Sequence, residues 1–421
     1  MRNSKRGDKT PHVRPIQRVE ISESNVKLRM ILVVVLLAIA SVAIIVGLSS
    51  ALKKEPGWHR INVQTTNMNC GADFVLNYDL SGAGSASTAQ YKKLTSLYTA
   101  ACEDAFRIFS PDVPGVGTAN VYDLNHRPNE TVTVSPALYQ ALDMIQRNQS
   151  RNLYLGAVYT EYDRIFWAET EVEAAAYDPL QNPELLEDIG KLSAFANDPA
   201  MIDIRLLGNN QVKLEVAEAY LSFAKDNEIE KLIDFGWMKN AFIADYLAQI
   251  LIDNDFTDGY LASYDGFTRN LDTRSNSYAF NVFDRSGKDI YLPAVMSYAS
   301  PASIVFLRDY PLGQSDVRHY YSFPDGHIAS LLIDPADGMY KASLDSLVSY
   351  SADQSCAELL LQMIPVFITD TFSAAQLQQM ADSGIHSIWC QEQNLYYTDA
   401  QLALELQPQE DISYTKVFAG S

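Results

Sequence analysis

The sequence is poor in the residues and motifs on which many enzymes depend. It has only four cysteines and six histidines in 421 residues, and these form neither a CxxC pair nor an HExxH motif. The GxSxG, P-loop and GxGxxG patterns are missing as well. These absences argue against a zinc protease, an α/β-hydrolase and a dinucleotide-binding enzyme. A Ser-His-Asp or Cys-His site stays open, although no spacing points to one.

Positive charge is also scarce, and most of the negative charge lies in one part of the chain. Of 32 basic and 52 acidic residues, 8 and 3 lie in residues 1–29, which leaves 24 and 49 for the rest, a net charge of −25. A surface with this charge repels DNA, RNA and anionic lipid. The composition therefore predicts that no nucleic acid is a partner.

One long apolar run stands out near the N-terminus. The 23 residues from Met30 to Leu52 carry no charge, and a helix of that length spans a bilayer core of roughly 30 Å. The basic excess in residues 1–29 favours a cytoplasmic N-terminus. We therefore predict a single transmembrane helix with the C-terminal domain outside the cytoplasm. The alternative is a cleaved signal peptide, with Ser49 and Ala51 as the small residues before the cleavage site.

Beyond this run we predict a stalk over residues 53–65 and one α+β domain over 66–421. A strand is expected in 66–79, a helix from about Ser87 with Gln90 in a capping box, and helices from Pro136, Trp237, Ser355 and Ser373. Strands are expected in 259–350 and 386–398. The four cysteines are too far apart for a typical zinc site, and they are either paired or buried as small hydrophobic residues.

Three acidic, turn-rich segments are candidates for a functional site. They are IDFGWMKNAFIAD (233–245), SYDGF (263–267) and LLIDPADG (331–338). The first leads from an apolar stretch into a helix N-terminus, where free N–H groups can bind phosphate. Each segment taken singly also has a structural interpretation, because Asp-Gly and Asp-Pro pairs are common in turns and an Asp at a helix start is a common cap.

Taken together and in this order, the three segments resemble the FAD:protein FMN transferase family, the ApbE-like proteins. The family motif DLGGIAKGYAVD aligns without a gap with DFGWMKNAFIAD, and its IIDPRTG motif aligns with LIDPADG. The resemblance covers roughly residues 66–400 and implies an ApbE-like, T-fold-related domain with a mixed or antiparallel sheet and flanking helices. It also implies FAD and magnesium as cofactors, and a target protein that receives FMN on a Thr or Ser.

The resemblance implies a set of site residues. Glu358 and Asp265 stand at catalytic positions, and Glu358, Gln362 and the carbonyl of Lys239 stand at metal positions. The implied cofactor-binding residues are Cys70, Gly71, Asp234, Gly236, Lys239, Asn240, Asp245, Gly266, Asp334 and Gly338.

The sequence departs from the family at the positions that carry its chemistry. The family's Lys-Gly becomes Asn240-Ala241, its Gly-Gly becomes Asp265-Gly266, and its His before the IDP motif becomes Leu331. Glu358 and Gln362 replace an Asp and a Thr with longer side chains, and magnesium requires near-ideal octahedral geometry. Two interpretations follow. The chain is either a membrane-anchored FMN transferase or an inactive ApbE-like module that binds a flavin, a nucleotide or a protein.

Overall fold

A computed structural model describes residues 54–65, 68–313, 316 and 319–420. The chain divides into two compact units, Met1–Lys54 and Glu55–Ser421, and the second unit contains nearly all of the described residues. The predicted transmembrane helix at 30–52 lies outside them. Among the described residues, no helix is both long enough and apolar enough to cross a membrane.

The second unit contains both helices and strands in an irregular order. The α-helices are α2 (Ser87–Phe109), α3 (Val121–His126), α4 (Pro136–Arg147), α5 (Gly156–Trp167), α6 (Glu171–Ala176), α7 (Pro183–Asn197), α8 (Glu218–Asp226), α9 (Lys239–Asp253), α10 (Cys356–Phe367) and α11 (Ala374–Asp382). The strands are β1 (Trp58–Ile61), β2 (Phe74–Asp79), β3 (Thr131–Thr133), β4 (Ile202–Gly208), β5 (Gln211–Val216), β6 (Gly259–Ser263), β7 (Phe267–Asn270), β8 (Ser277–Ser286), β9 (Asp289–Ala299), β10 (Ala302–Arg308), β11 (Tyr320–Ser322), β12 (Ile328–Ser330), β13 (Ser346–Ser351), β14 (His386–Gln391), β15 (Asn394–Tyr397), β16 (Ala403–Leu406) and β17 (Thr415–Phe418).

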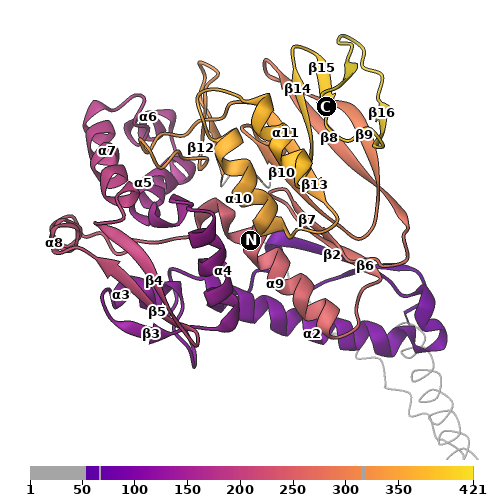
Figure 1. The fold of residues 1–421 in the computed structure, drawn as a ribbon, viewed down its shortest axis with the longest axis horizontal. Coiled ribbons are helices and arrows are strands. Elements are labelled where there is room, and N and C mark those ends of the chain that lie inside the picture. The colour runs from indigo at the N-terminus through magenta and orange to yellow at the C-terminus, as the bar shows by residue number, and fades with distance from the viewer. Residues whose placement is uncertain (1–53, 66–67, 314–315, 317–318, 421) are drawn as a thin grey trace, which may run out of the picture. The chain divides into compact units, whose positions relative to one another are not determined.

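A nine-stranded sheet forms the centre of this unit. Its strand order is β1-β2-β6-β7-β10-β13-β14-β15-β17, and every neighbouring pair is antiparallel except β15 and β17. The long helices α2, α9 and α10 lie on one face of this sheet (Figure 1). The small sheet β16-β9-β8 covers part of the other face.

The sequence of β10 shows why the sheet is covered on both faces. All seven residues of this strand are buried, and successive side chains of a strand point to opposite faces. Val305 and Leu307 belong to the core cluster that includes the helices, whereas Ile304 and Phe306 belong to the cluster under β8 and β9. The apolar run from Ile304 to Leu307 therefore suits a position in the middle of the sheet, where both faces of the strand are covered.

A second group of elements lies on the left in Figure 1 and comprises α3, α5–α8 and the sheet β3-β5-β4. This group contributes to the same core as the central helices, for example through Ile189 of α7 and Leu214 of β5. The sequence-based interpretation assigned no elements to 110–134 or to 150–230, so this whole group was missed.

The α+β class with an antiparallel-rich sheet is confirmed. The helix predicted from Ser87 is present, but the capping box with Gln90 was wrong, because Ser87 is the first helical residue and its hydroxyl donates to the Gly84 carbonyl at 2.6 Å. Ser135 caps α4 by accepting from the N–H of Leu138. Trp58–Ile61, inside the predicted stalk, forms β1 and pairs with β2.

Candidate functional site

The segment 233–238 forms a tight turn that leads into α9. The backbone N–H of Gly236 donates to Asp234 Oδ1 at 2.9 Å, and Gly236 has a φ of 52°. A Cβ on Gly236 would lie 2.6 Å from the ring of Tyr159 in α5, so only glycine fits here. Burial raises the pKa of Asp234, and Lys239 acts in the opposite direction.

Asp265 and Asn240 are brought together although they are 25 residues apart. Asn240 Nδ2 donates to Asp265 Oδ2 at 2.8 Å, while the Oδ1 atoms of both side chains are buried without a partner among the described residues. Gly266 follows with a φ of 112°, and the N–H of Phe306 donates to its carbonyl at 2.9 Å. A Cβ on Gly266 would overlap the Phe306 carbonyl, which fixes this turn against β10.

Asp245 joins α9 to the N-terminus of α10. Its carboxylate accepts from the N–H groups of Cys356 and Ala357 at 2.9 and 2.8 Å. The Arg269 Nε atom lies 3.5 Å from Asp245 Oδ1. Burial raises the pKa of Asp245, and Arg269 opposes this effect. Asp245 therefore holds the backbone groups that a phosphate would need at this helix end.

Glu358 and Gln362 have protein partners of their own. Glu358 forms a capping box with Ser355: Glu358 Oε2 accepts from the Ser355 N–H at 2.9 Å, and the Glu358 N–H donates to Ser355 Oγ at 3.3 Å. Gln362 Nε2 donates to Asn148 Oδ1 of the chain following α4, at 2.8 Å. Glu358 therefore caps the start of its own helix, whereas Gln362 links α10 to the end of α4.

The segment 334–338 is a turn that packs against α5 and α7. The N–H of Ala336 donates to Asp334 Oδ1 at 2.9 Å, and Lys341 Nζ lies 3.2 Å from Asp334 Oδ2. Gly338 has a φ of 76°, and its Cβ would lie 2.6 Å from Ile189 Cγ2. The hydroxyl of Tyr162 donates to the Gly338 carbonyl at 2.9 Å.

Cys70 and Gly71 precede β2 and line neither of the two spaces described below. The N–H of Cys70 donates to the Cys102 carbonyl at 3.3 Å. The contact with the Cys102 thiol, followed by burial, raises the pKa of Cys70. All four cysteines are described, and all are buried free thiols.

Only three of the remaining candidate residues line either of two separate spaces: Asp265 lines the first, and Asp245 and Glu358 line the second. The first is a small cavity of about 30 Å³, and Trp237, Asp265 and Leu331 are part of its wall. Arg308 and Asp316 also line it and form an ion pair of 2.9 Å, with side chains that are only 2% and 4% exposed. Sequence reasoning missed this pair, because neither residue belongs to a recognisable motif. The cavity has room for a few water molecules at most.

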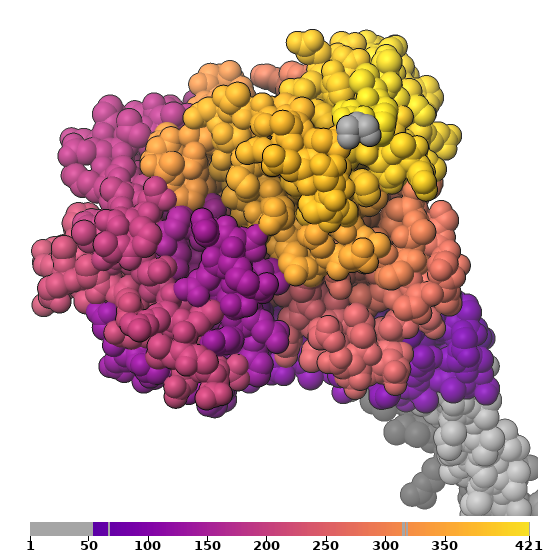
Figure 2. Space-filling model, in the orientation of Figure 1, coloured from indigo at the N-terminus to yellow at the C-terminus, as the bar shows by residue number. Residues whose placement is uncertain are grey.

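The second space is a cleft of about 550 Å³ between α2, α4, α9 and α10. Figure 2 shows the face on which α4, in purple, lies beside α10, in orange. The wall is mainly apolar, with Phe109, Met144 and Phe242, and its charged members are Asp245 and Glu358. No lysine or arginine is among the described residues that line it.

These residues do not fit magnesium and FAD. Glu358 and Gln362 supply one carboxylate and one amide, and the described residues contain no group of three or more His, Cys, Asp or Glu side chains arranged to hold a metal. Magnesium takes six oxygen atoms in an octahedron and binds through carboxylates and phosphates. A pyrophosphate in the cleft would face Asp245 and Glu358, and no basic side chain is among the described residues that line the cleft.

Comparison with known proteins supports the fold. No family model and no curated protein matches the sequence. Among solved structures, the chain is similar to the ApbE protein of Thermotoga maritima, with 12% identity over 79% of this chain and 94% of that chain and a TM-score of 0.53. The flavin transferase ApbE of Vibrio cholerae matches with 13% identity over 83% and 97% of the two chains and a TM-score of 0.49. The ApbE-like fold inferred from the three motifs is confirmed.

Proposed function

We propose that this protein is a membrane-anchored binding module on the ApbE-like fold, displayed outside the cytoplasm, and that it does not transfer FMN. The observation that carries this proposal is the hydrogen bonding of the backbone N–H groups at the N-terminus of α10. Its first N–H groups are bonded to Asp245 and Ser355, in a cleft whose charged lining residues are both acidic. Such a cleft disfavours an anionic nucleotide.

The size and lining of the cleft support binding of a small, largely apolar molecule. Its volume of about 550 Å³ lies within the range of roughly 300–1,000 Å³ that is typical of ligand pockets. Burial of an apolar ligand against Phe109, Met144 and Phe242 would supply most of the free energy of binding. The free lone pairs of Glu358 would accept a hydrogen bond from the ligand.

Binding of the neutral dye Nile red to the full-length protein in maltoside micelles tests this proposal. We expect saturable fluorescence enhancement, measured against empty micelles, which Ala137→Trp abolishes because the indole fills the cleft that Ala137 lines. Ala200→Trp is the matched control, since Ala200 lies in an exposed turn outside the cleft. Equal dye binding by both variants would overturn the assignment of the ligand site.

The family's activity is the competing interpretation, and its support is the fold together with the Asp234, Gly236 and Asp245 spacing. It requires FAD to bind in a magnesium-dependent way despite Leu331 and Asp265. Titration of FAD with and without magnesium decides between the two interpretations, independently of the dye experiment.

A further inference from the structure

The two acidic residues that line the cleft between α2, α4, α9 and α10 differ in their partners. They are Asp245 and Glu358. Both oxygens of Asp245 accept hydrogen bonds from backbone N–H groups in the first turn of α10. Arg269 Nε lies 3.5 Å from Asp245 Oδ1, so a guanidinium also opposes the charge of this carboxylate. Asp245 is therefore bound to the protein itself and has little left to offer a ligand.

Glu358 keeps one oxygen free. Its Oε2 atom accepts from the Ser355 N–H at 2.9 Å, whereas its Oε1 atom has no hydrogen bond to any described residue. No described lysine or arginine forms an ion pair with Glu358, and none lines the cleft. The side chain is only partly exposed to solvent. One carboxylate therefore remains without a basic partner in the described part of the lining, at the start of α10.

The rest of the cleft wall is mainly apolar. Phe109 of α2, Met144 of α4 and Phe242 of α9 line the same space of about 550 Å³ as Glu358. The helices α4 and α10, which form two of the walls, lie beside each other in Figure 1. Apolar surroundings lower the effective dielectric constant, which strengthens the attraction between Glu358 and a positive charge on a ligand.

We propose that the ligand of this cleft is a protonated amine with an apolar body. The proposal rests on the function proposed above for the cleft, and it specifies the chemical class of the ligand. The ammonium group donates to Glu358 Oε1, and a hydrogen bond between two charged groups is roughly twice as strong as one between neutral groups. The hydrocarbon part covers Phe109, Met144 and Phe242. A ligand with a carboxylate or a phosphate in place of the ammonium group is repelled by Glu358.

Displacement of Nile red from the full-length protein in maltoside micelles tests the proposal. The competitors are heptylamine, heptan-1-ol and heptanoate, which share the length of their chain. At pH 7 the amine is positively charged, the alcohol is neutral and the acid is negatively charged. We expect heptylamine to displace the dye at a concentration at least roughly tenfold lower than heptan-1-ol does, with heptanoate as the weakest competitor.

Glu358→Gln keeps the size of the side chain and removes its charge. We expect this change to reduce the advantage of heptylamine over heptan-1-ol to less than about twofold. The comparison between variants cancels the partitioning of each competitor into the micelles. Glu218→Gln is the matched control and should keep the full advantage, because Glu218 also lies in the first turn of a helix, α8, but is exposed and outside the cleft.

The three competitors also separate this inference from the function proposed for the cleft. An absence of saturable dye binding would overturn both. Saturable dye binding with equal displacement by heptylamine and heptan-1-ol would overturn the amine alone and leave the cleft as a site for neutral molecules. The amine is also overturned if Glu358→Gln, folded by circular dichroism, keeps the full advantage of heptylamine, or if heptanoate displaces the dye better than heptan-1-ol.

Discussion

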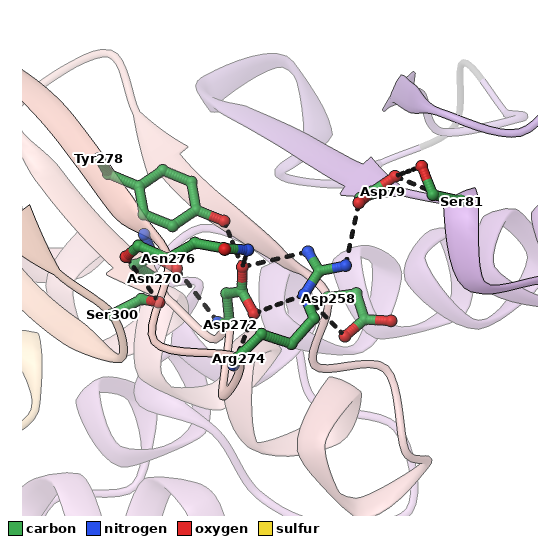
Figure 3. Close-up of polar contacts among 9 residues, drawn as sticks. All are labelled: Asp79, Ser81, Asp258, Asn270, Asp272, Arg274, Asn276, Tyr278 and Ser300. Atoms are coloured by element: carbon green, nitrogen blue, oxygen red, sulfur yellow. Dashed lines mark hydrogen bonds and ion pairs between the residues drawn. The ribbon is translucent and has the colours of Figure 1, made fainter.

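Replacing Asp272 by asparagine should cause a large and pH-dependent loss of stability. The Asp272 side chain is 0% exposed and accepts from the Arg274 backbone and guanidinium, from Asn276 and from Tyr278, at 2.6 to 3.1 Å. Asparagine removes the charge and turns an amide N–H₂ toward some of these donors. Breaking a buried charge pair in this way costs about 3–5 kcal/mol. We expect a loss of about 3 kcal/mol in the free energy of unfolding, since Arg274 keeps Asp79 and Asp258 as partners (Figure 3).

The pH dependence follows from the pKa of this carboxyl group. Burial alone would raise the pKa of Asp272, but hydrogen bonds from Arg274 and Tyr278 outweigh burial and hold it below its ordinary value. A lowered folded-state pKa contributes stability above the unfolded-state pKa of about 4, and this contribution is lost as the pH falls further. The difference between the unchanged protein and Asp272→Asn should therefore be large at pH 7 and smaller at pH 3.5.

Urea unfolding followed by circular dichroism at the two pH values is the assay. Asp226→Asn, at the exposed C-terminal end of α8, is the matched control and should change stability by less than ~0.5 kcal/mol. A loss below ~1 kcal/mol for Asp272→Asn at pH 7, or an equal loss at both pH values, would refute the reasoning.

Three further changes probe other parts of the molecule. Gly266→Ala should destabilise the protein by more than ~2 kcal/mol, because Gly266 has a φ of 112° and a Cβ there would overlap the Phe306 carbonyl. The control Gly287→Ala should cost only ~1 kcal/mol, because Gly287 has a φ of 64° and open space around it. Equal urea midpoints for the two variants would contradict the close approach of Gly266 to Phe306. Burial raises the pKa of Asp309 to about 7. The contribution of this group to the stability of the folded protein therefore falls as the pH rises from about 4 to 7. Asp309→Asn should therefore improve the free energy of unfolding more at pH 8 than at pH 5, and an equal effect would count against the shift. Trp237→Ala should lower the free energy of unfolding in urea by about 3–5 kcal/mol, since Trp237 is 8% exposed and lines the small cavity. A loss under ~1 kcal/mol would mean that the side chains around this cavity are not well packed.

Some features of the fold could be predicted because they depend on local patterns. The helix over 87–109 and the helices after Ser135 and Ser355 have apolar residues at helical spacing, and the latter two also have an N-cap side chain. The group α5–α8 was missed because the burial of its helices depends on distant partners, such as Tyr162 with Gly338. Tertiary contacts of that kind leave no periodic signal in the sequence.

The candidate site could be predicted only in part. The motif alignment pointed to Asp234, Asp245 and Asp334, and the structure shows each of them accepting backbone hydrogen bonds in a turn or at a helix end. Whether they contact a ligand remains a prediction. The ion pair of Arg308 and Asp316 could not be foreseen, because its effect depends on burial and not on sequence spacing.

The central claim, that the ApbE-like fold here serves binding without FMN transfer, is tested most directly by titrating FAD into the full-length protein in maltoside micelles, with and without magnesium, while AMP is measured in the same samples. The expected result is weak or undetectable FAD binding that magnesium does not strengthen, no release of AMP, and no difference between the unchanged protein and Glu358→Ala. Tight binding that requires magnesium, that Glu358→Ala abolishes and that is followed by release of AMP would contradict the claim.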